Sequence, residues 1–559
     1  MKVQKWLIKR TNDDFLRYLA RQVNVSKNLA QILVNRGLKT KTEAFRFLNP
    51  SLNQLHDPML LPDMDRAVKR IMKAVSKKEK VLVFGDYDVD GITATSVMVM
   101  ALHALGLEAS YYIPDRIEEG YGFNSRGIRK AIADRISLII TVDCGVSSFH
   151  EVLKAASSGI DVIITDHHIP FTTLPEAIAV INPNRFDSNY PFKSLAGVGV
   201  AFKLCQVLIE KNWEQFLDLV AIGTLADSVP LVGENRVLVY YGLKQINSKC
   251  RVGLNALKQT TGYHTKYITS GFLTYKIIPR LNAAGRLSTA TTGVEFLMTE
   301  NLRKATTLAT HLDEMNRKRK IIEDEVYQAA IVKLQYLEGG NVLVLASKKW
   351  HPGVLGIVAS RLVEEFYRPV FLFTTDGTIA KGSARSIAPF DLYNGIEQCS
   401  DILDGFGGHS QAAGLRLPFN NIDTFRSRID NIVKKALSRE DYIPKLRVDL
   451  TVPLEQINYS LVKEISKLEP FGYFNEEPKI GVKDLTVIDP RIVGKGHLKM
   501  RLRKDSINLG AIGFGMGNMI EKLVRSPKVD AVFSPTINEY NGIQSLQLNL
   551  KGLRFISKT

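Results

Sequence analysis

Residues 162–168 read Val-Ile-Ile-Thr-Asp-His-His, an apolar run that ends abruptly in one carboxylate and two imidazoles. Burying such ionisable side chains without partners is costly, so a plain buried strand has no structural use for them. Metal ligation uses them directly. Two other apolar runs also end in acidic residues, at 81–91 (Val-Leu-Val-Phe-Gly-Asp-Tyr-Asp-Val-Asp-Gly) and at 138–145 (Leu-Ile-Ile-Thr-Val-Asp-Cys-Gly). Together the three runs predict one metal site at one edge of a sheet.

Short apolar stretches alternate with helical patterns from residue 81 to about residue 182. This alternation predicts an α/β fold with a parallel, doubly wound sheet. In such sheets ligands bind beyond the carboxyl ends of the strands, and each acidic cluster follows such an end. The expected strands are 81–85, 109–113, 137–142, 160–165 and 178–181.

The rest of the chain divides into segments of different character. The pattern around 300–337 predicts one long amphipathic helix that connects two globular parts. A second, smaller α/β unit follows it, and alternating strands with Gly- and Asn-rich turns predict a C-terminal β-barrel. The expected boundaries are 1–60 for an N-terminal helical segment, 61–235 for the α/β domain with the acidic clusters, 236–338 for the helical region with its connector, 339–440 for the second α/β domain and 446–559 for the barrel.

The composition of the chain indicates which binding partners and which cellular compartment to expect. The 559 residues carry a formal net charge of +17, which favours a polyanion such as nucleic acid, although a lysine bias of the host proteome would give the same balance. The four cysteines form no CxxC motif, so we expect reduced thiols and a cytosolic setting. We expect no signal peptide, and no apolar run reaches the roughly 18–20 residues of a membrane span.

The cluster Asp86-Tyr-Asp88-Val-Asp90-Gly91 lies between an expected strand and an expected helix. Carboxylate oxygens in a tight loop suit Mg²⁺ or Mn²⁺. An EF-hand loop begins in the same way but needs a glutamate at its twelfth position, where this chain has Val97. The EF-hand interpretation is therefore rejected.

The other two strand ends add ligands of a different kind. Asp143 follows a neighbouring strand, and Asp227 follows an apolar helix; either alone would be an ordinary turn or surface residue. The pair His167 and His168 favours Mn²⁺, Zn²⁺ or Fe over Mg²⁺ alone, and one imidazole could ligate while the other contacts a phosphate. These ligands exceed the needs of one ion. Two ions about 3.5–4 Å apart would use them for in-line attack of water on phosphorus.

The chain resembles the DHH phosphoesterases and, within them, the bacterial RecJ single-strand exonuclease family. The resemblance runs over almost the whole chain, with seven motifs in the family order. These are Gly85-Asp86-Tyr-Asp88-Val-Asp90-Gly91, Asp143-Cys-Gly145, Asp166-His-His168, Leu195-Ala-Gly-Val-Gly-Val200, Pro279-Arg280-Leu-Asn282-Ala-Ala-Gly285-Arg286, Lys381-Gly-Ser383-Ala-Arg385-Ser and Gly407-Gly408-His409-Ser-Gln-Ala-Ala-Gly414. The last two look like the family's DHHA1 domain, and 446–559 is similar to its OB-fold.

The resemblance also implies roles for individual residues. The implied metal ligands are Asp86, Asp88, Asp90, Asp143, His167 and Asp227, with Asp88 and Asp90 preferred within the first cluster. The catalytic set is His168 at the scissile phosphate, Asp166 as its orienting partner, and Arg280 and Asn282 facing substrate phosphates. The substrate-binding set is Arg116, Ser383 and Arg385 at the 5′ end, together with Arg286 and His409.

The function implied is removal of 5′-mononucleotides from single-stranded DNA in the 5′-to-3′ direction, in DNA repair and recombination, with two Mn²⁺ or Mg²⁺ ions. The implied partners are single-stranded DNA with a 5′ end, a single-strand-binding protein and a helicase, for a cytoplasmic monomer without membrane contact. Two alternatives remain open. One is a phosphodiesterase for short oligonucleotides or cyclic dinucleotides, and the other is a catalytically silent DNA-binding scaffold.

The chain departs from the family pattern at 470–476. Phe474 and Glu476 stand where the pattern usually has glycine and proline. This segment lies at the entrance to the expected OB-fold, so the departure bears on the path of the DNA and not on the chemistry.

Overall fold

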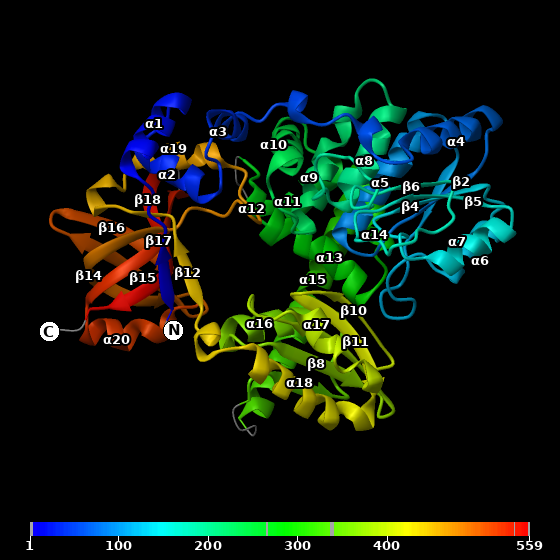
Figure 1. The fold of residues 1–559 in the computed structure, drawn as a ribbon. Coiled ribbons are helices and arrows are strands. Elements are labelled where there is room, and N and C mark those ends of the chain that lie inside the picture. The colour runs from blue at the N-terminus through cyan, green and yellow to red at the C-terminus, as the bar shows by residue number, and fades with distance from the viewer. Residues whose placement is uncertain (1–3, 264–266, 336–339, 541–542, 557–559) are drawn as a thin grey trace. The chain divides into compact units, whose positions relative to one another are not determined.

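The structure is a computed structural model that describes residues 4–263, 267–335, 340–540 and 543–556 (Figure 1). The chain forms two compact units. The first unit combines Met1–Ser51 with Ile443–Thr559, and the second is Leu52–Tyr442. The N-terminal segment thus belongs to the same unit as the C-terminal barrel, whereas the sequence suggested a segment of its own.

The second unit begins with a five-stranded, fully parallel sheet in the order β3-β2-β4-β5-β6. Its strands lie within one residue of the predicted ranges, because buried parallel strands are near-continuous apolar runs. They are β2 (Val81–Phe84), β3 (Ala109–Tyr112), β4 (Leu138–Val142), β5 (Asp161–Thr165) and β6 (Ala179–Ile181).

Helices cover both faces of this sheet, which confirms the doubly wound fold. On β2, Val81 and Val83 join one apolar core, and Leu82 and Phe84 join another on the opposite face. The helices of this domain are α4 (Met64–Lys77), α5 (Val89–Ala104), α6 (Ser125–Ala133), α7 (Phe149–Ser157), α8 (Gly197–Leu208), α9 (Leu217–Ala226) and α10 (Gly233–Ser248), of which α9 and α10 pack on other helices. The chain order reverses between β2 and β4, so the sheet has a topological switch point there, where doubly wound folds bind ligands.

A helical region leads to the predicted long connector, α15 (Leu302–Leu334, 33 residues). Asn301 caps it by accepting a hydrogen bond from the backbone N–H of Lys304 at 3.0 Å. Before it come α11 (Val252–Thr260), α12 (Ser270–Phe272), a π-helical turn η4 (Leu273–Ile277), α13 (Ile278–Leu287) and α14 (Thr291–Met298).

The second α/β domain is a mixed five-stranded sheet in the order β10-β11-β9-β8-β7. Its strands are β7 (Leu343–Ser347), β8 (Val370–Thr375), β9 (Ile379–Arg385), β10 (Gly405–His409) and β11 (Ala412–Pro418). One face packs against α18 (Ile422–Ala436), through Phe425 on Phe371 and Phe373. The other face packs against α16 (Leu355–Phe366) and the end of α15. The short helix α17 (Leu392–Glu397) completes the domain.

The first unit contains the predicted C-terminal barrel, drawn in orange and red in Figure 1. Its strand order is β13-β14-β15-β16-β18-β17, and β17 also pairs with β14, which closes the sheet. The strands are β13 (Leu450–Thr451), β14 (Ile480–Val493), β15 (His497–Lys504), β16 (Ile507–Gly513), β17 (Lys528–Tyr540) and β18 (Ile543–Phe555), with helices α19 (Tyr459–Ile465) and α20 (Ile520–Arg525).

The N-terminal residues pack on this barrel. The predicted helices are present as α1 (Asp13–Val23), α2 (Lys27–Asn35) and α3 (Lys41–Leu48), and they share one apolar core with the barrel. The helical prediction is wrong for Lys5–Ile8, which form strand β1, parallel to β12 (Lys445–Val448). A strand of four residues whose partner lies at the other end of the chain leaves no local signal in the sequence.

All four cysteines are free, as predicted. Within the described ranges, none of the helices combines the length and apolar character needed to cross a membrane.

Gly242 allows α10 to pack closely on α9. A Cβ atom at this position would lie 2.2 Å from the carbonyl oxygen of Leu217 and 2.4 Å from the Cβ of Ala221. Gly242→Ala is therefore expected to lower the free energy of unfolding by about 1–3 kcal/mol, measured by urea denaturation. The control is Gly271→Ala, whose added Cβ would meet only the Thr269 Oγ1 at 3.8 Å. Equal stability of the two variants would contradict this packing.

Candidate metal and phosphate site

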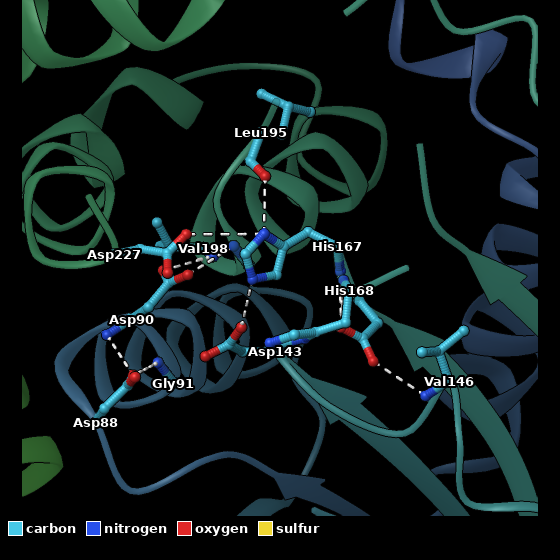
Figure 2. Close-up of polar contacts among 12 residues, drawn as sticks. Asp88, Asp90, Gly91, Asp143, Val146, His167, His168, Leu195, Val198 and Asp227 are labelled. Atoms are coloured by element: carbon cyan, nitrogen blue, oxygen red, sulfur yellow. Dashed lines mark hydrogen bonds and ion pairs between the residues drawn. The ribbon is translucent and has the colours of Figure 1, made fainter. Parts of the chain in front are cut away.

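Acidic and imidazole side chains from three neighbouring strands meet at the switch point of the parallel sheet. The loop 85–91 follows β2, Asp143 follows β4, and Asp166, His167 and His168 follow β5. Figure 2 shows Asp88, Asp90, Asp143 and Asp227 around His167. The sequence expectation that these strand ends meet at one sheet edge is confirmed by the strand order.

Two of the three aspartates in the first cluster contact helix N-termini. Asp88 caps α5, and its carboxylate accepts from the backbone N–H groups of Asp90 (2.9 Å) and Gly91 (3.1 Å). The Asp90 carboxylate accepts from Gly197 (2.6 Å) and Val198 (2.9 Å) at the start of α8. In contrast, the Oδ1 atom of Asp86 is buried without a hydrogen-bond partner. The resemblance in sequence favours Asp88 and Asp90 as the ligands of this cluster. That choice stays a prediction, because the carboxylate oxygen left without a hydrogen-bond partner belongs to Asp86.

Asp143 lies in tight contact with the first residue of α8. Its backbone has a φ of +61°, which few non-glycine residues adopt. A Cβ atom on Gly197 would lie 2.3 Å from the Oδ1 of Asp143, so only glycine fits there. This Oδ1 is also buried without a hydrogen-bond partner.

His167 has one ring nitrogen held by the backbone and the other directed at a carboxylate. Its Nδ1 lies 3.1 Å from the carbonyl oxygen of Leu195, a contact that fixes the proton on Nδ1. Its Nε2 then carries a lone pair and lies 3.3 Å from the Oδ1 of Asp143 (Figure 2). Burial opposes the charged ring, but Asp227 and Asp90 raise the pKa of His167, so in the metal-free chain a proton on Nε2 can satisfy this contact and a metal cation would take its place. A backbone contact at the other nitrogen is typical of metal-bound histidine.

Asp166 has a different environment from the other aspartates. Its carboxylate accepts from the N–H groups of Val146 (2.9 Å), His167 (2.7 Å) and His168 (3.0 Å), and it lies 2.7 Å from the Nδ1 of His168. Burial alone would raise the pKa of Asp166, but His168 and these hydrogen bonds lower it to about 2. Burial likewise opposes ionisation of His168, yet Asp166 raises the pKa of His168 to about 9. Asp166 therefore orients His168 and keeps it protonated at neutral pH.

Four other carboxylates of the site have too few hydrogen bonds and cations around them to stabilise their negative charge. Burial first, and then neighbouring carboxylates, raise the pKa of Asp86 and of Asp143 well above the usual range. The same two causes raise the pKa of Asp90 to about 7 and that of Asp227 to about 6. The Oδ2 atom of Asp227 is a third buried oxygen without a hydrogen-bond partner. Divalent cations fit this donor set, because hard oxygen atoms with imidazole suit Mn²⁺ and, for the oxygens alone, Mg²⁺.

Three ligand sets lie within metal-binding reach. In each set, one ligand atom per residue lies within 4.8 Å of the others. The sets are Asp86, Asp88 and Asp143; Asp90, His167 and Asp227; and Asp143, His167 and His168. Asp143 and His167 each belong to two sets. Asp143 has two carboxylate oxygens and could contact two ions, whereas His167, with one free nitrogen, could bind only one.

A cluster of guanidinium groups lies beside these carboxylates. Burial first, and then repulsion from Arg116, Arg319 and Arg385, lowers the pKa of Arg286 to about 9. Burial and Arg116 also lower the pKa of Arg385. Arg116 lies 4.8 Å from the centre of the Tyr87 ring and interacts electrostatically with Asp86. Such a concentration of like charge fits an anion that carries more than one charge.

Ser383 and Arg385 lie together on β9, next to the start of α16. The Arg385 guanidinium donates to the Ser383 Oγ at 3.3 Å. A Cβ atom on Gly356 would lie 2.8 Å from Arg385 Nη2 and 3.0 Å from Ser383 Oγ. The second α/β domain therefore contributes these two predicted substrate residues to the guanidinium cluster.

Three further residues predicted to contact substrate phosphates lie in different environments. His409 on β10 interacts with His168 and His167, which together with burial lower its pKa. Asn282 lies one turn before Arg286 on α13. Arg280, in contrast, donates to the Oδ1 of Asp313 at 2.9 and 2.8 Å and to the carbonyl oxygen of Lys276 at 2.6 Å. Its guanidinium is held by protein atoms, a setting that the sequence did not suggest.

Three family models match the chain: "DHH family, N-terminal domain" over residues 80–224, "DHHA1 domain" over 339–435 and "RecJ OB domain" over 448–552. A single-stranded-DNA-specific exonuclease RecJ from Bacillus subtilis is 40% identical over 553 residues, which cover 98% of this chain and 70% of the relative. The RecJ of Escherichia coli is 34% identical over 552 residues, 93% of this chain and 94% of the relative.

This chain belongs to the RecJ family. Solved structures agree with this assignment. Thermus thermophilus RecJ in complex with Mn²⁺ matches with a TM-score of 0.84 and 28% identity, over 99% of this chain and 80% of that one. Another exonuclease RecJ bound to manganese matches with a TM-score of 0.60 and 33% identity, over 70% of this chain and all of that one. The predicted resemblance and fold class are thus confirmed.

Sequence reasoning did not assign a role to Tyr121 in this RecJ chain. The Tyr121 hydroxyl donates to the carbonyl oxygen of Asp143 (3.2 Å) and lies 3.1 Å from the Nδ1 of His168. Its neighbours Gly120 and Gly122 have φ values of +81° and +95°. An aromatic residue between two glycines was the available signal, because such a loop lets the backbone place one side chain freely.

The raised pKa values predict how metal stabilises this RecJ chain. Raised carboxyl pKa values mean that the metal-free fold loses stability as pH rises from about 4 to about 7, where the unfolded chain releases protons that the fold retains. A cation reverses this loss only when the carboxylates are ionised. In thermal melts, Mn²⁺ should therefore raise the melting temperature more at about pH 8 than at about pH 5.5. Equal shifts at both pH values would contradict the carboxylate site.

Proposed function

We propose that this RecJ-family chain hydrolyses phosphodiester bonds at the 5′ end of single-stranded DNA and releases 5′-mononucleotides, using Mn²⁺ or Mg²⁺. The observation that carries this proposal is that two sites of opposite charge, each without enough counter-charge, lie next to each other. Asp86 and Asp143 present buried, unpartnered oxygens that fit cations, and the adjacent Arg116 and Arg286 fit an anion. Relatives from Bacillus subtilis and Escherichia coli named single-stranded-DNA-specific exonuclease support the substrate.

The proposed metal ligands are Asp86, Asp88, Asp90, Asp143, His167 and Asp227, which the three ligand sets contain. Bound there, two divalent ions would lower the pKa of a water molecule between them and offset charge on the phosphate. Complexes of Thermus thermophilus RecJ with Mn²⁺ and with Mg²⁺ support this choice of ions.

His168 is proposed to donate a hydrogen bond to the scissile phosphate. Asp166 holds its Nδ1, and the raised pKa of about 9 keeps the ring cationic at neutral pH. A cationic donor in a fixed orientation stabilises negative charge as it develops on the phosphate oxygens. The Tyr121 ring packs edge-on against the His168 ring, with centroids 5.5 Å apart, and limits its rotation.

The 5′ polarity is proposed to come from the guanidinium cluster. Arg116, Arg286 and Arg385 would bind a terminal phosphate, with Ser383 as a further donor. A terminal phosphate has more charge than an internal one, and it would offset the burial and the mutual repulsion that lower the pKa of Arg286. Binding the end of the strand in this way sets the direction of digestion.

The remaining predicted residues receive distinct proposed roles. His409 interacts electrostatically with His168 and would contact the same phosphate from the second α/β domain. Asn282 would donate to a substrate phosphate from α13. Arg280, held by Asp313, would act as a positioning residue that fixes α13 against α15.

We also propose a role in DNA repair and recombination, with a single-strand-binding protein and a helicase as partners of a monomeric, cytoplasmic enzyme. These proposals rest on the resemblance of the sequence to the family. An assay with Mn²⁺ and 5′-labelled single-stranded DNA tests the activity itself. Release of mononucleotides is expected. Digestion of only very short oligonucleotides would favour the phosphodiesterase alternative, and tight binding without release would favour the scaffold.

Asp143→Ala is expected to lower the rate of cleavage at least about a thousandfold, because it removes a ligand shared by two sets. Affinity for single-stranded DNA, measured without metal by fluorescence anisotropy, should change by no more than a few fold. The matched control is Asp134→Ala, an exposed aspartate paired with Lys130. Retained turnover in purified Asp143→Ala would remove this residue from the site.

Arg385→Ala is expected to reduce the preference for a 5′-phosphate over a 5′-hydroxyl by about tenfold or more, since one charge-assisted hydrogen bond is lost. The measurement compares initial rates on the two strands at low substrate concentration. Arg416→Ala, on the neighbouring strand β11 and half exposed, serves as the control. An unchanged preference in Arg385→Ala would contradict the assignment of the 5′ end to this cluster.

A further inference from the structure

The turn formed by residues 472–475 exposes two adjacent aromatic side chains just before β14. Tyr473 is 53% exposed and Phe474 is 63% exposed. Their ring centroids are 4.9 Å apart and their planes meet at 73°. Gly472 and Asn475 close the turn through reciprocal backbone hydrogen bonds of 3.0 Å.

Phe474 occupies a backbone conformation that does not suit it. Its φ is +62°, at the second central position of the turn, which glycine or asparagine usually occupies. A bulky residue in the left-handed region is strained, and a side chain that is mostly exposed recovers little of that cost through burial. Strain of this kind persists where the surrounding structure enforces it, and it concentrates at binding sites.

The surrounding structure does enforce this turn. The Asn475 side chain is fully buried and donates to the carbonyl oxygens of Leu468 (2.9 Å) and Pro470 (2.7 Å). The Arg36 guanidinium from the end of α2 donates to the Asn475 side chain and to the carbonyl oxygen of Glu476 (2.6 Å). The two rings are therefore held out from a rigid base, so little conformational entropy remains to be lost when they bind.

We propose that Tyr473 and Phe474 form a stacking site for bases of single-stranded DNA as the strand crosses the barrel unit. This inference rests on the proposed function, because it takes single-stranded DNA as the substrate. Aromatic rings stack on any base, and barrels of the OB type combine such rings with cations along the strand. Arg36 and Lys479 are cations beside the turn, offset by Asp449 and Glu476, in a chain with a net charge of +17.

The geometry defines what the site would hold. Because the two ring planes meet at 73°, one base can lie flat on only one ring while its edge meets the other. Phe474 has the more exposed ring and is the expected stacking surface. Recognition would depend on the base being present but not on its identity, which suits an enzyme that digests any sequence.

Affinity measurements on the full chain without metal test this site. Phe474→Ala should bind an oligothymidylate about tenfold more weakly than the unmodified chain, the usual scale of one lost base–aromatic stack. On a strand of the same length made of abasic sites, the two proteins should bind equally. The control is Tyr18→Ala, an exposed aromatic on α1 of the same unit (60% exposed), which should leave both affinities unchanged. Equal binding of the oligothymidylate by Phe474→Ala, or an equal loss on both strands, would overturn the proposal.

A second variant separates binding from folding. Phe474→Gly relieves the left-handed strain, so its melting temperature should be equal to or higher than that of the unmodified chain while its affinity for the oligothymidylate falls as in Phe474→Ala. A lower melting temperature would mean that Phe474 serves packing, and it would overturn the proposal.

Turnover measurements keep this inference distinct from the proposed function. An unmodified chain without nuclease activity would contradict the proposed function. Normal nuclease activity with unchanged affinity in Phe474→Ala would contradict the stacking site alone.

Discussion

The burial of several carboxylates at one end of a parallel sheet is the constraint on which the rest of this structure depends. Asp86, Asp90, Asp143 and Asp166 are each at most 3% exposed, and Asp227 lies against them. Only Asp166 is fully compensated, by three backbone N–H groups and His168, and its pKa falls to about 2. The others have raised pKa values, so the fold alone does not stabilise their charges. A cation is the simplest partner for such a site.

The guanidinium cluster is the complement of this carboxylate site. Arg116, Arg286 and Arg385 repel one another as the aspartates do, but with the opposite sign. A phosphate bound between metal ions and guanidinium groups would satisfy both clusters together. The two α/β domains of the second unit supply different parts of this arrangement, since the metal-site residues come from the domain of the parallel sheet and Arg385 from that of the mixed sheet. Substrate binding and metal binding are therefore expected to strengthen each other.

The sequence predicted the parallel sheet well, because apolar runs that end in charged residues are a local signal. It predicted the meeting of the three acidic strand ends for the same reason. It could not predict contacts between distant segments, such as β1 with β12 or Arg280 with Asp313, which depend on packing between remote elements. It also could not rank Asp86, Asp88 and Asp90, because the difference lies in which backbone N–H groups each carboxylate accepts. Phe474 stood out as an unusual residue, but only the backbone angle reveals its strain.

In the metal-free chain, protons occupy the carboxylate site until metal displaces them. Titration calorimetry of Mn²⁺ binding near pH 7, repeated in buffers with different ionisation enthalpies, measures the number of protons released. With Asp90 at a pKa of about 7, and with the pKa values of Asp86 and Asp143 also well above the usual range, binding should release at least about one proton per chain. Binding enthalpies that are the same in every buffer would contradict it, because the carboxylates would then be ionised before the metal arrives.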